Sequence, residues 1–241
     1  MSDPATPDGT TEHLPEALRT CRRCPRLVAH REAVAREKRA SYRDETYWGA
    51  PVPGFGDPDA RLVILGLAPG AHGSNRTGRQ FTGDASGAFL FPALHRAGLA
   101  DRPHSERRGD GLALRGTWIT AAVRCVPPGN APTRAEAATC RPWLEDDLQR
   151  LPAARVVLAF GAFAHAAYLD RLAARGAKVV KARHPFAHAA EHDLPAAYPD
   201  AGAHQLLDGY HPSFQNTNTG RLTPAMMDAV LARAKALAGV A

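Results

Sequence analysis

The sequence predicts an α/β fold with a mainly parallel sheet that helices cover on both faces. Short apolar stretches that read as buried strands alternate with helix-forming stretches of about a dozen residues, which is typical of βαβ units. A long glycine-rich loop follows the first confident strand, where open α/β sheets place their ligand sites. The chain has 241 residues and no linker, repeat or second core, so we expect one large domain.

The N-terminal part is predicted to be irregular. Residues 1–13 are polar and are expected to form a disordered tail, which leaves a single domain at 14–241. A helix is expected at 14–38, interrupted by two cysteines, and 42–56 is expected to be a loop because it is rich in Pro, Gly and aromatic residues. There is no signal pattern and no apolar run near the ~20 residues of a membrane span. We therefore expect a soluble, cytoplasmic protein without a membrane partner.

The remaining elements are predicted from the spacing of apolar residues and from the residues that typically begin or end helices and strands. Strands are expected at 61–67, 117–123, 155–160 and 205–210, with a weaker strand within 179–181. Helices are expected at 86–99, 133–151, 161–172 and 223–237. Ser86 can cap the first of these helices, Pro142 suggests a break in the second, and Pro224 suits the first turn of the last. A surface loop is expected at 101–116 and an irregular insert at 184–204.

The chain is basic, with 30 Lys and Arg against 24 Asp and Glu and a net charge of +6. A basic balance fits a phosphate-rich partner such as nucleic acid. An excess of arginine is also typical of a GC-rich genome, so the composition alone leaves the partner open.

The four cysteines predict a metal site. Cys21 and Cys24 form a C-x2-C pair, and Cys125 and Cys140 follow far along the chain. Without a secretion signal a disulfide framework is not expected. Four thiolates suit an iron–sulfur cluster or structural Zn²⁺, although a compact zinc site more often joins two nearby C-x2-C pairs. Four unrelated buried thiols are the plain alternative.

The glycine-rich loop at 66–87 carries groups suited to a flipped-out nucleobase. Phe81 is a candidate stacking platform, and Asp84 can stabilise positive charge on a sugar and orient or deprotonate a water. Phe81 could instead be a core anchor, Asp84 a helix-terminal residue, and the glycines a phosphate cradle, although the pattern is neither a P-loop nor a clean G-x-G-x-x-G. Candidate contacts to the base are Gly66, Leu67, Ala68, Gly70 and His72. Candidate contacts to DNA are Asn75, Arg76 and Arg79.

A second polar loop begins at His211, directly after the last expected strand. A histidine there can donate to a base oxygen and stabilise the anion as the base leaves. Candidate phosphate contacts in this loop are Ser213, Gln215, Asn216 and Arg221. The insert histidines are interpreted as solvated surface rather than a metal site, because Pro185 prevents a regular helical metal-binding face. These are His184, His188, His192 and His204.

Four segments carry a resemblance to a known family. They are CRRCPRLVAHRE at 21–32, GLAPGAHGSNRTGRQFTGDASG at 66–87, AAVRCVPPGNAPT at 121–133 and HPSFQNTNTGRLT at 211–223. On these segments the chain resembles the uracil-DNA glycosylase superfamily, and within it the type 5 iron–sulfur group of bacteria and archaea. The resemblance implies a three-layer α/β/α sandwich with a small, mainly parallel central sheet, and a structural 4Fe–4S cluster on the four cysteines.

The resemblance also implies an activity and its residues. It implies hydrolysis of the N-glycosidic bond of uracil, and of hypoxanthine or other deaminated bases, in DNA, which starts base excision repair. Other groups carry a polar or acidic residue where Ala68 stands, so the water-orienting role is assigned to Asp84, assisted by His211. The type 4 group carries an asparagine where Ala121 stands, and Asn130 is a candidate substitute that reads the base.

The leading hypothesis is a monomeric DNA glycosylase that acts on double- or single-stranded DNA. Neither base-handling loop contains a lysine, so a Schiff-base lyase mechanism is not expected. The alternative is a non-catalytic DNA-binding module with a structural metal site, and a third reading is a redox iron–sulfur protein.

Overall fold

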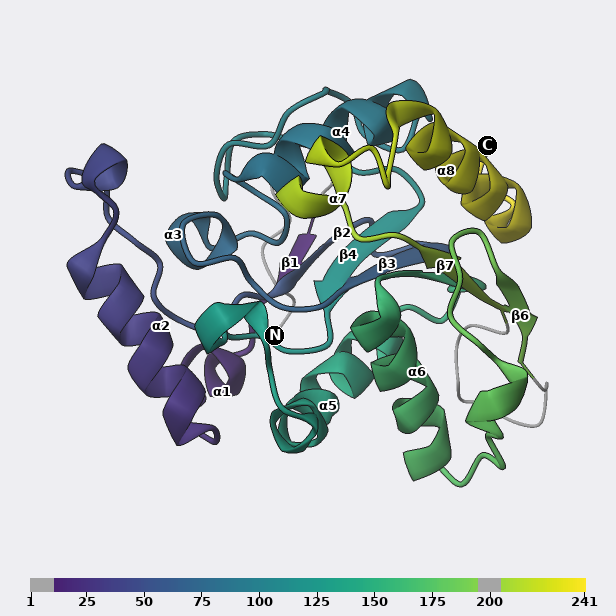
Figure 1. Ribbon diagram of the computed structural model, residues 1–241, viewed down its shortest axis with the longest axis horizontal. Helices are drawn as coiled ribbons and strands as arrows, with labels where there is room; N and C mark the ends of the chain where they lie inside the picture. Colours follow the sequence, from purple (N-terminus) through teal and green to yellow (C-terminus); the bar gives the residue numbers. More distant parts are fainter. Residues whose placement is uncertain (1–10, 195–204) are drawn as a thin grey trace.

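Four apolar strands form the parallel centre of the sheet in a computed structural model, which describes residues 11–194 and 205–241 (Figure 1). The strands are β4 (Thr117–Ala121), β3 (Leu62–Gly66), β5 (Val156–Phe160) and β7 (Gln205–Gly209), paired in that order. Every residue of β3, β4 and β5 is buried. Such continuous burial marks strands that are covered on both faces.

Short antiparallel strands flank this centre, and the described order is β1-β2-β4-β3-β5-β7-β6. β1 (Thr11–His13) and β2 (Gly54–Gly56) lie at one edge, and β6 (Glu191–Asp193) lies at the other. The sequence analysis expected a disordered tail through residue 13, but residues 11–13 form β1 and pair with β2. The rest of that tail lies outside the described residues.

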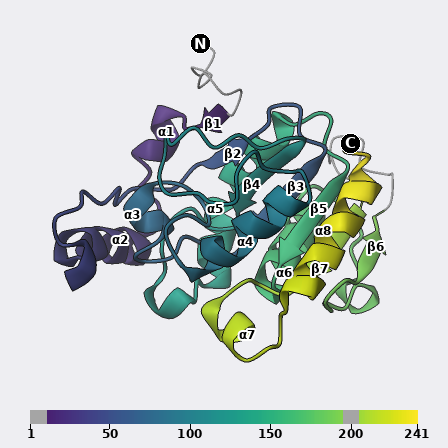
Figure 2. The same cartoon turned by 90° about the horizontal axis from the view of Figure 1, so that it is seen from above.

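Helices cover both faces of the sheet, which confirms the α/β fold class (Figures 1 and 2). α4 (Ala85–Arg96) and α8 (Pro224–Ala238) cover one face, and α5 (Arg134–Gln149) and α6 (Ala162–Ala174) cover the other. The alternation within β3 shows why both faces need cover. Leu62 and Ile64 enter the core beneath α4 and α8, whereas Val63 and Leu65 enter the core with α5 and α6.

The N-terminal segment and the loops contain the remaining elements. α1 (Glu16–Arg19), α2 (Pro25–Glu37) and the 3₁₀ turn η1 (Ala40–Tyr42) fill the region expected to be an interrupted helix and a loop. α3 (Ser74–Thr77), η2 (Pro128–Asn130) and α7 (Phe214–Asn218) lie in the loops after β3, β4 and β7. In the described chain no helix is long and apolar enough to cross a membrane.

Three expected details are wrong. Asp84, not Ser86, caps α4. α5 continues through Pro142, because Cys140 and Leu144 on either side stay buried while the proline removes a single backbone donor. The weak strand at 179–181 does not form: Val180 is half exposed, the turn η3 (Lys181–Arg183) follows, and the edge strand is β6.

A buried carboxylate joins α5 to β4 and to the loop that carries Cys125. Asp147 accepts hydrogen bonds from Trp118 Nε1 at 3.3 Å, Thr120 Oγ1 at 2.5 Å and Arg124 Nη2 at 2.5 Å. The side chains of Arg124 and Asp147 are each 1% exposed. Arg124 is thus a structural residue, and its guanidinium depends on this carboxylate for charge compensation.

We predict that Asp147→Ala lowers the free energy of unfolding by about 3–5 kcal/mol, because it leaves a buried guanidinium without a counter-ion. Urea denaturation monitored by circular dichroism measures the loss. The matched control is Asp228→Ala, which removes an exposed ion pair with Arg96 and should cost at most about 1 kcal/mol. Equal losses in the two variants would contradict the prediction.

Candidate active site

The carboxyl ends of the parallel strands surround a cleft of ≈ 1200 Å³. Its walls come from the loop after β3, the turn η2 after β4, the start of α6 after β5 and the loop after β7. Loops at the carboxyl ends of neighbouring parallel strands meet at one edge of a sheet. This topology therefore brings together segments that lie up to about 150 residues apart in the sequence.

The cleft contains every residue that the sequence analysis assigned to catalysis or to base binding. These are Gly66, Leu67, Ala68, Gly70, His72, Phe81, Asp84, Asn130 and His211. Ser213 and Gln215 also line it. The fold thus brings these residues to one cleft, and their individual roles are taken up below as proposals.

Asp84 is both a helix cap and a cleft residue. Its Oδ1 accepts hydrogen bonds from the backbone N–H groups of Ser86 at 3.0 Å and Gly87 at 3.1 Å. Its Oδ2 lies against Gly70 and Gly73, where an added Cβ would come within 2.8 Å and 2.1 Å of that oxygen. Glycine at these two positions therefore makes room for the carboxylate. Burial raises the pKa of Asp84, against the opposing effect of its two backbone hydrogen bonds.

Phe81 is both a core residue and part of the cleft wall. It is 7% exposed and packs edge-on against Phe160, with ring centroids 6.2 Å apart. Its ring covers Gly66, where an added Cβ would lie 2.8 Å from a ring atom. The φ of Phe81 is +53°, a left-handed conformation that is costly for an aromatic residue. Strain of this kind at a cleft residue fits a ring held in place for binding.

The ring of His211 lies beside that of Phe81, with centroids 5.7 Å apart and an angle of 30° between the ring planes. The imidazole is partly exposed to the cleft, but the surrounding protein atoms lower its pKa to about 4 by desolvation. His72 also has a lowered pKa, mainly from burial and secondarily from Arg39, and its Nδ1 lies 3.1 Å from the Tyr47 hydroxyl. The cleft thus holds neutral histidines at neutral pH.

Two of the predicted DNA contacts are wrong. Asn75 is fully buried and donates from Nδ2 to the carbonyl of Arg31 at 3.3 Å. Arg79 is 4% exposed and pairs with Asp110 at 2.6 Å. A long loop with only one short helical turn must supply hydrogen-bond partners for most of its own polar groups, so these polar residues point inward.

Arg76 is also largely committed to the loop. Its Nε donates to the carbonyl of His72 at 2.7 Å, its Nη2 donates to the carbonyl of Gly83 at 3.0 Å, and it pairs with Glu45 at 2.5 Å. Its guanidinium stacks on the ring of Tyr42 at 4.0 Å. Arg76 therefore holds the shape of the loop around the cleft.

The loop after β7 remains open to solvent. Ser213 caps α7 by accepting from the backbone N–H of Asn216 at 3.3 Å, and the Asn216 side chain donates to the carbonyl of His211 at 2.8 Å. Gln215 is exposed, and the Arg221 guanidinium lies 4.7 Å from the centroid of the Tyr210 ring. The sequence analysis gave no role to Phe214, which is 66% exposed at the rim of the cleft. A single large aromatic residue within a polar segment was the feature of the sequence that could have indicated an exposed role for Phe214.

The sequence analysis expected all the insert histidines to lie at the surface, and for His192 this is wrong. His192 is buried, and His188 stacks on Tyr210 with ring centroids 4.9 Å apart. His184 is partly exposed, and His204 lies outside the described residues. Pairing of β6 with β7 turns His192 inward, because alternate residues of a strand point to opposite faces.

The four cysteines line one small pocket between α2, the loop after β4 and α5. Two of their sulfurs accept hydrogen bonds: Cys125 Sγ from Arg31 Nη1 at 3.0 Å and Cys140 Sγ from the backbone N–H of Arg124 at 3.3 Å. Burial raises the pKa of Cys140 to about 12. The set offers four sulfur donors and N–H groups directed at them, which are the features of a metal–thiolate site.

Comparison with known proteins identifies the family. A family model described as the uracil DNA glycosylase superfamily matches residues 53–235. The chain belongs to this superfamily. It is 54% identical to a type-5 uracil-DNA glycosylase of Thermus thermophilus, over 95% of this chain and 99% of that protein. It is 49% identical to a type-5 uracil-DNA glycosylase of Mycobacterium leprae, over 96% of this chain and 97% of that protein.

Similarity to another group of the superfamily is weaker. A type-4 uracil-DNA glycosylase of Pyrobaculum aerophilum is 30% identical over 70% of this chain and 69% of that protein. The solved structure of wild-type Pedobacter heparinus SMUG2 aligns with a TM-score of 0.45 at 13% identity, over 99% of this chain and 93% of that chain. The sequence matches therefore carry the assignment, and they confirm the resemblance to the type 5 group.

The lowered pKa of His211 has a consequence for stability. The unfolded chain takes up this proton near the ordinary pKa of 6.5, whereas the folded chain takes it up only near 4. The stability associated with neutral His211 is therefore complete above pH 6.5 and is lost as the pH falls towards 4. We predict that unfolding free energies measured from pH 7 to 4 fall less steeply in His211→Gln than in the wild type. Identical slopes would contradict the prediction.

Proposed function

We propose that this protein is a monofunctional uracil-DNA glycosylase that removes uracil from DNA and so starts base excision repair. The observation that carries the mechanism is the carboxylate of Asp84. One oxygen is fixed by two backbone N–H groups, and the other faces the cleft between two glycines. A carboxylate held in this way can orient water without moving during the reaction.

The base enters the cleft after it leaves the helical stack. The ring of Phe81 stacks on it, and backbone N–H groups of Leu67, Ala68 and Gly70 contact its polar edge. Asn130 lies on the opposite rim, exposed and with φ +56°, and contacts the base from that side. The resulting pocket reads the base mainly through backbone groups, which supports acceptance of hypoxanthine and other deaminated bases as well as uracil.

Cleavage of the N-glycosidic bond separates charge. The bond electrons leave with the base, and positive charge builds on the deoxyribose. Asp84 stabilises that positive charge and directs a water molecule to C1′. As the water attacks, its proton passes to the Asp84 carboxylate. His211, neutral because burial lowers its pKa to about 4, donates a hydrogen bond to the oxygen of the departing base. The products are an abasic site and the base anion, which becomes the free base by taking up a proton from solvent.

DNA is bound at the open rim of the cleft. Phe214 is a large, exposed aromatic side chain in the loop that begins with His211, and it can occupy the space that the base leaves in the duplex. Ser213, Gln215 and Arg221 lie on the same loop and supply phosphate contacts. Partners are uracil-containing duplex or single-stranded DNA, and binding should weaken steeply with salt because phosphate contacts release counter-ions.

The cysteine pocket is proposed to hold a 4Fe–4S cluster on Cys21, Cys24, Cys125 and Cys140. The four sulfurs in one pocket and the N–H groups of Arg31 and Arg124 directed at two of them fit such a cluster. When bound, it supplies a structural cross-link between the N-terminal helices and the sheet.

Substitutions at Asp84 separate its two roles. Asp84→Asn keeps an oxygen that can cap α4 but removes the negative charge, so single-turnover excision of uracil should slow by about 10²–10⁴-fold with little loss of stability. Asp84→Ala should slow excision similarly and also lower the unfolding free energy by about 1 kcal/mol. His211→Ala should slow excision by about 10²–10³-fold. Wild-type rates in Asp84→Asn would sink the mechanism, and DNA binding without excision in the wild type would favour a non-catalytic module.

The cluster has an independent test. The purified protein should contain about four iron and four sulfide per chain, and Cys140→Ser should lose iron together with visible absorbance and several degrees of melting temperature. Metal analysis and absorbance measure both. A colourless wild-type protein that contains one zinc per chain would exclude the cluster while leaving the glycosylase proposal untouched.

A further inference from the structure

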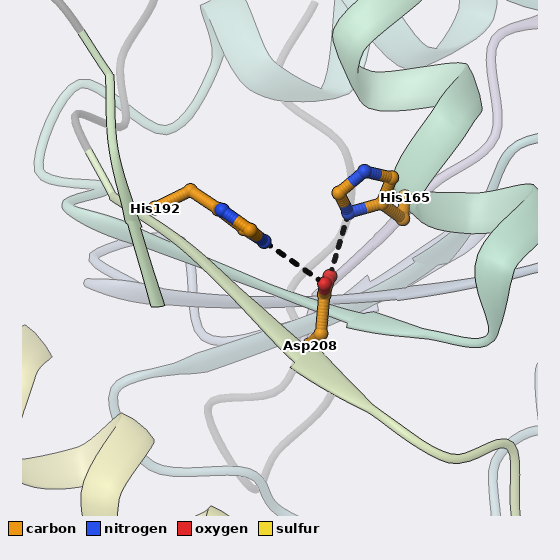
Figure 3. Close-up of side chains that lie close together, drawn as sticks. All are labelled: His165, His192 and Asp208. Atoms are coloured by element: carbon orange, nitrogen blue, oxygen red, sulfur yellow. Dashed lines mark hydrogen bonds and ion pairs between the residues drawn. The ribbon is translucent and has the colours of Figure 1, made fainter. Parts of the chain in front are cut away.

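A second cluster of metal-binding side chains lies in the core, outside the cleft and the cysteine pocket (Figure 3). It consists of His165 on α6, His192 on β6 and Asp208 on β7, and all three side chains are buried. Their ligand atoms lie within 4.8 Å of one another. Three elements that are distant in the sequence thus direct two imidazoles and one carboxylate at a single point.

Both oxygens of Asp208 are engaged by this cluster. His165 Nδ1 lies 2.8 Å from Oδ1, and His192 Nε2 lies 3.0 Å from Oδ2 (Figure 3). Both distances are hydrogen-bond distances, so the two rings and the carboxylate already face one another at close range.

The other nitrogen of His165 fixes its tautomer. Nε2 lies 2.9 Å from the backbone carbonyl of His184, and a carbonyl oxygen only accepts hydrogen bonds, so Nε2 carries a proton. The lone pair of a neutral His165 is therefore on Nδ1, directed at Asp208. Metal-ligating histidines in proteins are oriented in the same way, by a backbone carbonyl or carboxylate that binds the second ring nitrogen.

We propose that His165, His192 and Asp208 bind a divalent transition-metal ion of the Zn²⁺ type. Two imidazoles and one carboxylate are the donor set that Zn²⁺ accepts, at distances of about 2.0–2.2 Å. The ring of His184 stands next to that of His192, with centroids 5.4 Å apart, and brings a third imidazole to the cluster.

The ion would hold the edge of the sheet together. β6 has three residues and, among the described strands, pairs only with β7, so hydrogen bonding gives it little stability of its own. A metal shared by β6, β7 and α6 cross-links the insert to the core. Such a site belongs to the stability of the domain and does not depend on the proposed glycosylase chemistry.

The test uses the full chain with its cysteine site left as purified. After a wash with a mild chelator, titration with ZnCl2 should show about one added equivalent of zinc per chain by metal analysis and a melting temperature that rises with zinc concentration. Co²⁺ should give visible d–d bands without the near-ultraviolet thiolate charge-transfer band that a cysteine site would produce. Absence of the added zinc, or a thiolate band, would overturn the proposal.

Variants assign the ligands. His192→Gln keeps a donor to Asp208 but loses the imidazole lone pair, and it should weaken zinc binding by about 100-fold or more. The matched control is His95→Gln, an exposed histidine of α4 on the opposite face of the sheet, which should bind zinc as the wild type does. Equal affinity in His192→Gln and the wild type would refute the site. If His192→Gln does not fold, the zinc stoichiometry and the Co²⁺ spectrum of the wild type still show whether the site binds a metal ion.

Discussion

The position of the Asp84 carboxylate is the constraint on which the site depends. It is the only carboxylate in the loop at 66–87, and it stands at the first turn of α4, where two backbone N–H groups bind one of its oxygens. The glycines at 70 and 73 approach its other oxygen more closely than any larger residue could. Gly87 has the same kind of role, because a Cβ there would lie 1.8 Å from the carbonyl oxygen of Phe81. Four glycines of the loop, Gly66, Gly70, Gly73 and Gly87, are thus required by close contacts with Asp84 or Phe81.

The cysteine pocket and the cleft are parts of one hydrogen-bonded unit. Arg31 donates to the sulfur of Cys125, its backbone carbonyl accepts from the side chain of Asn75, and the Asn75 N–H donates to the carbonyl of Gly70. Each of these side chains is buried, so the chain of contacts is shielded from water and strengthened by low polarity. The N-terminal helices therefore support the loop as well as the cysteines. This explains why Asn75 is buried instead of facing DNA.

Periodicity and loop position predicted the fold centre and the cleft, because both follow from local rules. The strand predicted at 61–67 contains the continuous apolar run at 62–65, and Asp84, Phe81 and His211 follow strands whose carboxyl ends must share an edge. The predictions that were wrong concern side chains whose partners are distant in the sequence. Arg79 is as basic as a DNA contact would be, but Asp110 neutralises it, and nothing near Arg79 in the sequence announces that pairing. His192 likewise becomes a core residue only through the pairing of β6 with β7.

The burial of Asp84 has an energetic consequence. Burial raises its pKa, so ionising it in the folded state costs more than ionising it in the unfolded chain, and the stability due to this group declines as the pH rises through its folded pKa. His211 imposes no such cost at neutral pH, because it is uncharged in both states there. The hydrogen bonds from Ser86 and Gly87 partly offset the cost of burying the ionised carboxylate. The place of Asp84 at the N-terminus of α4 thus lets two backbone N–H groups compensate part of the cost of burying a charge.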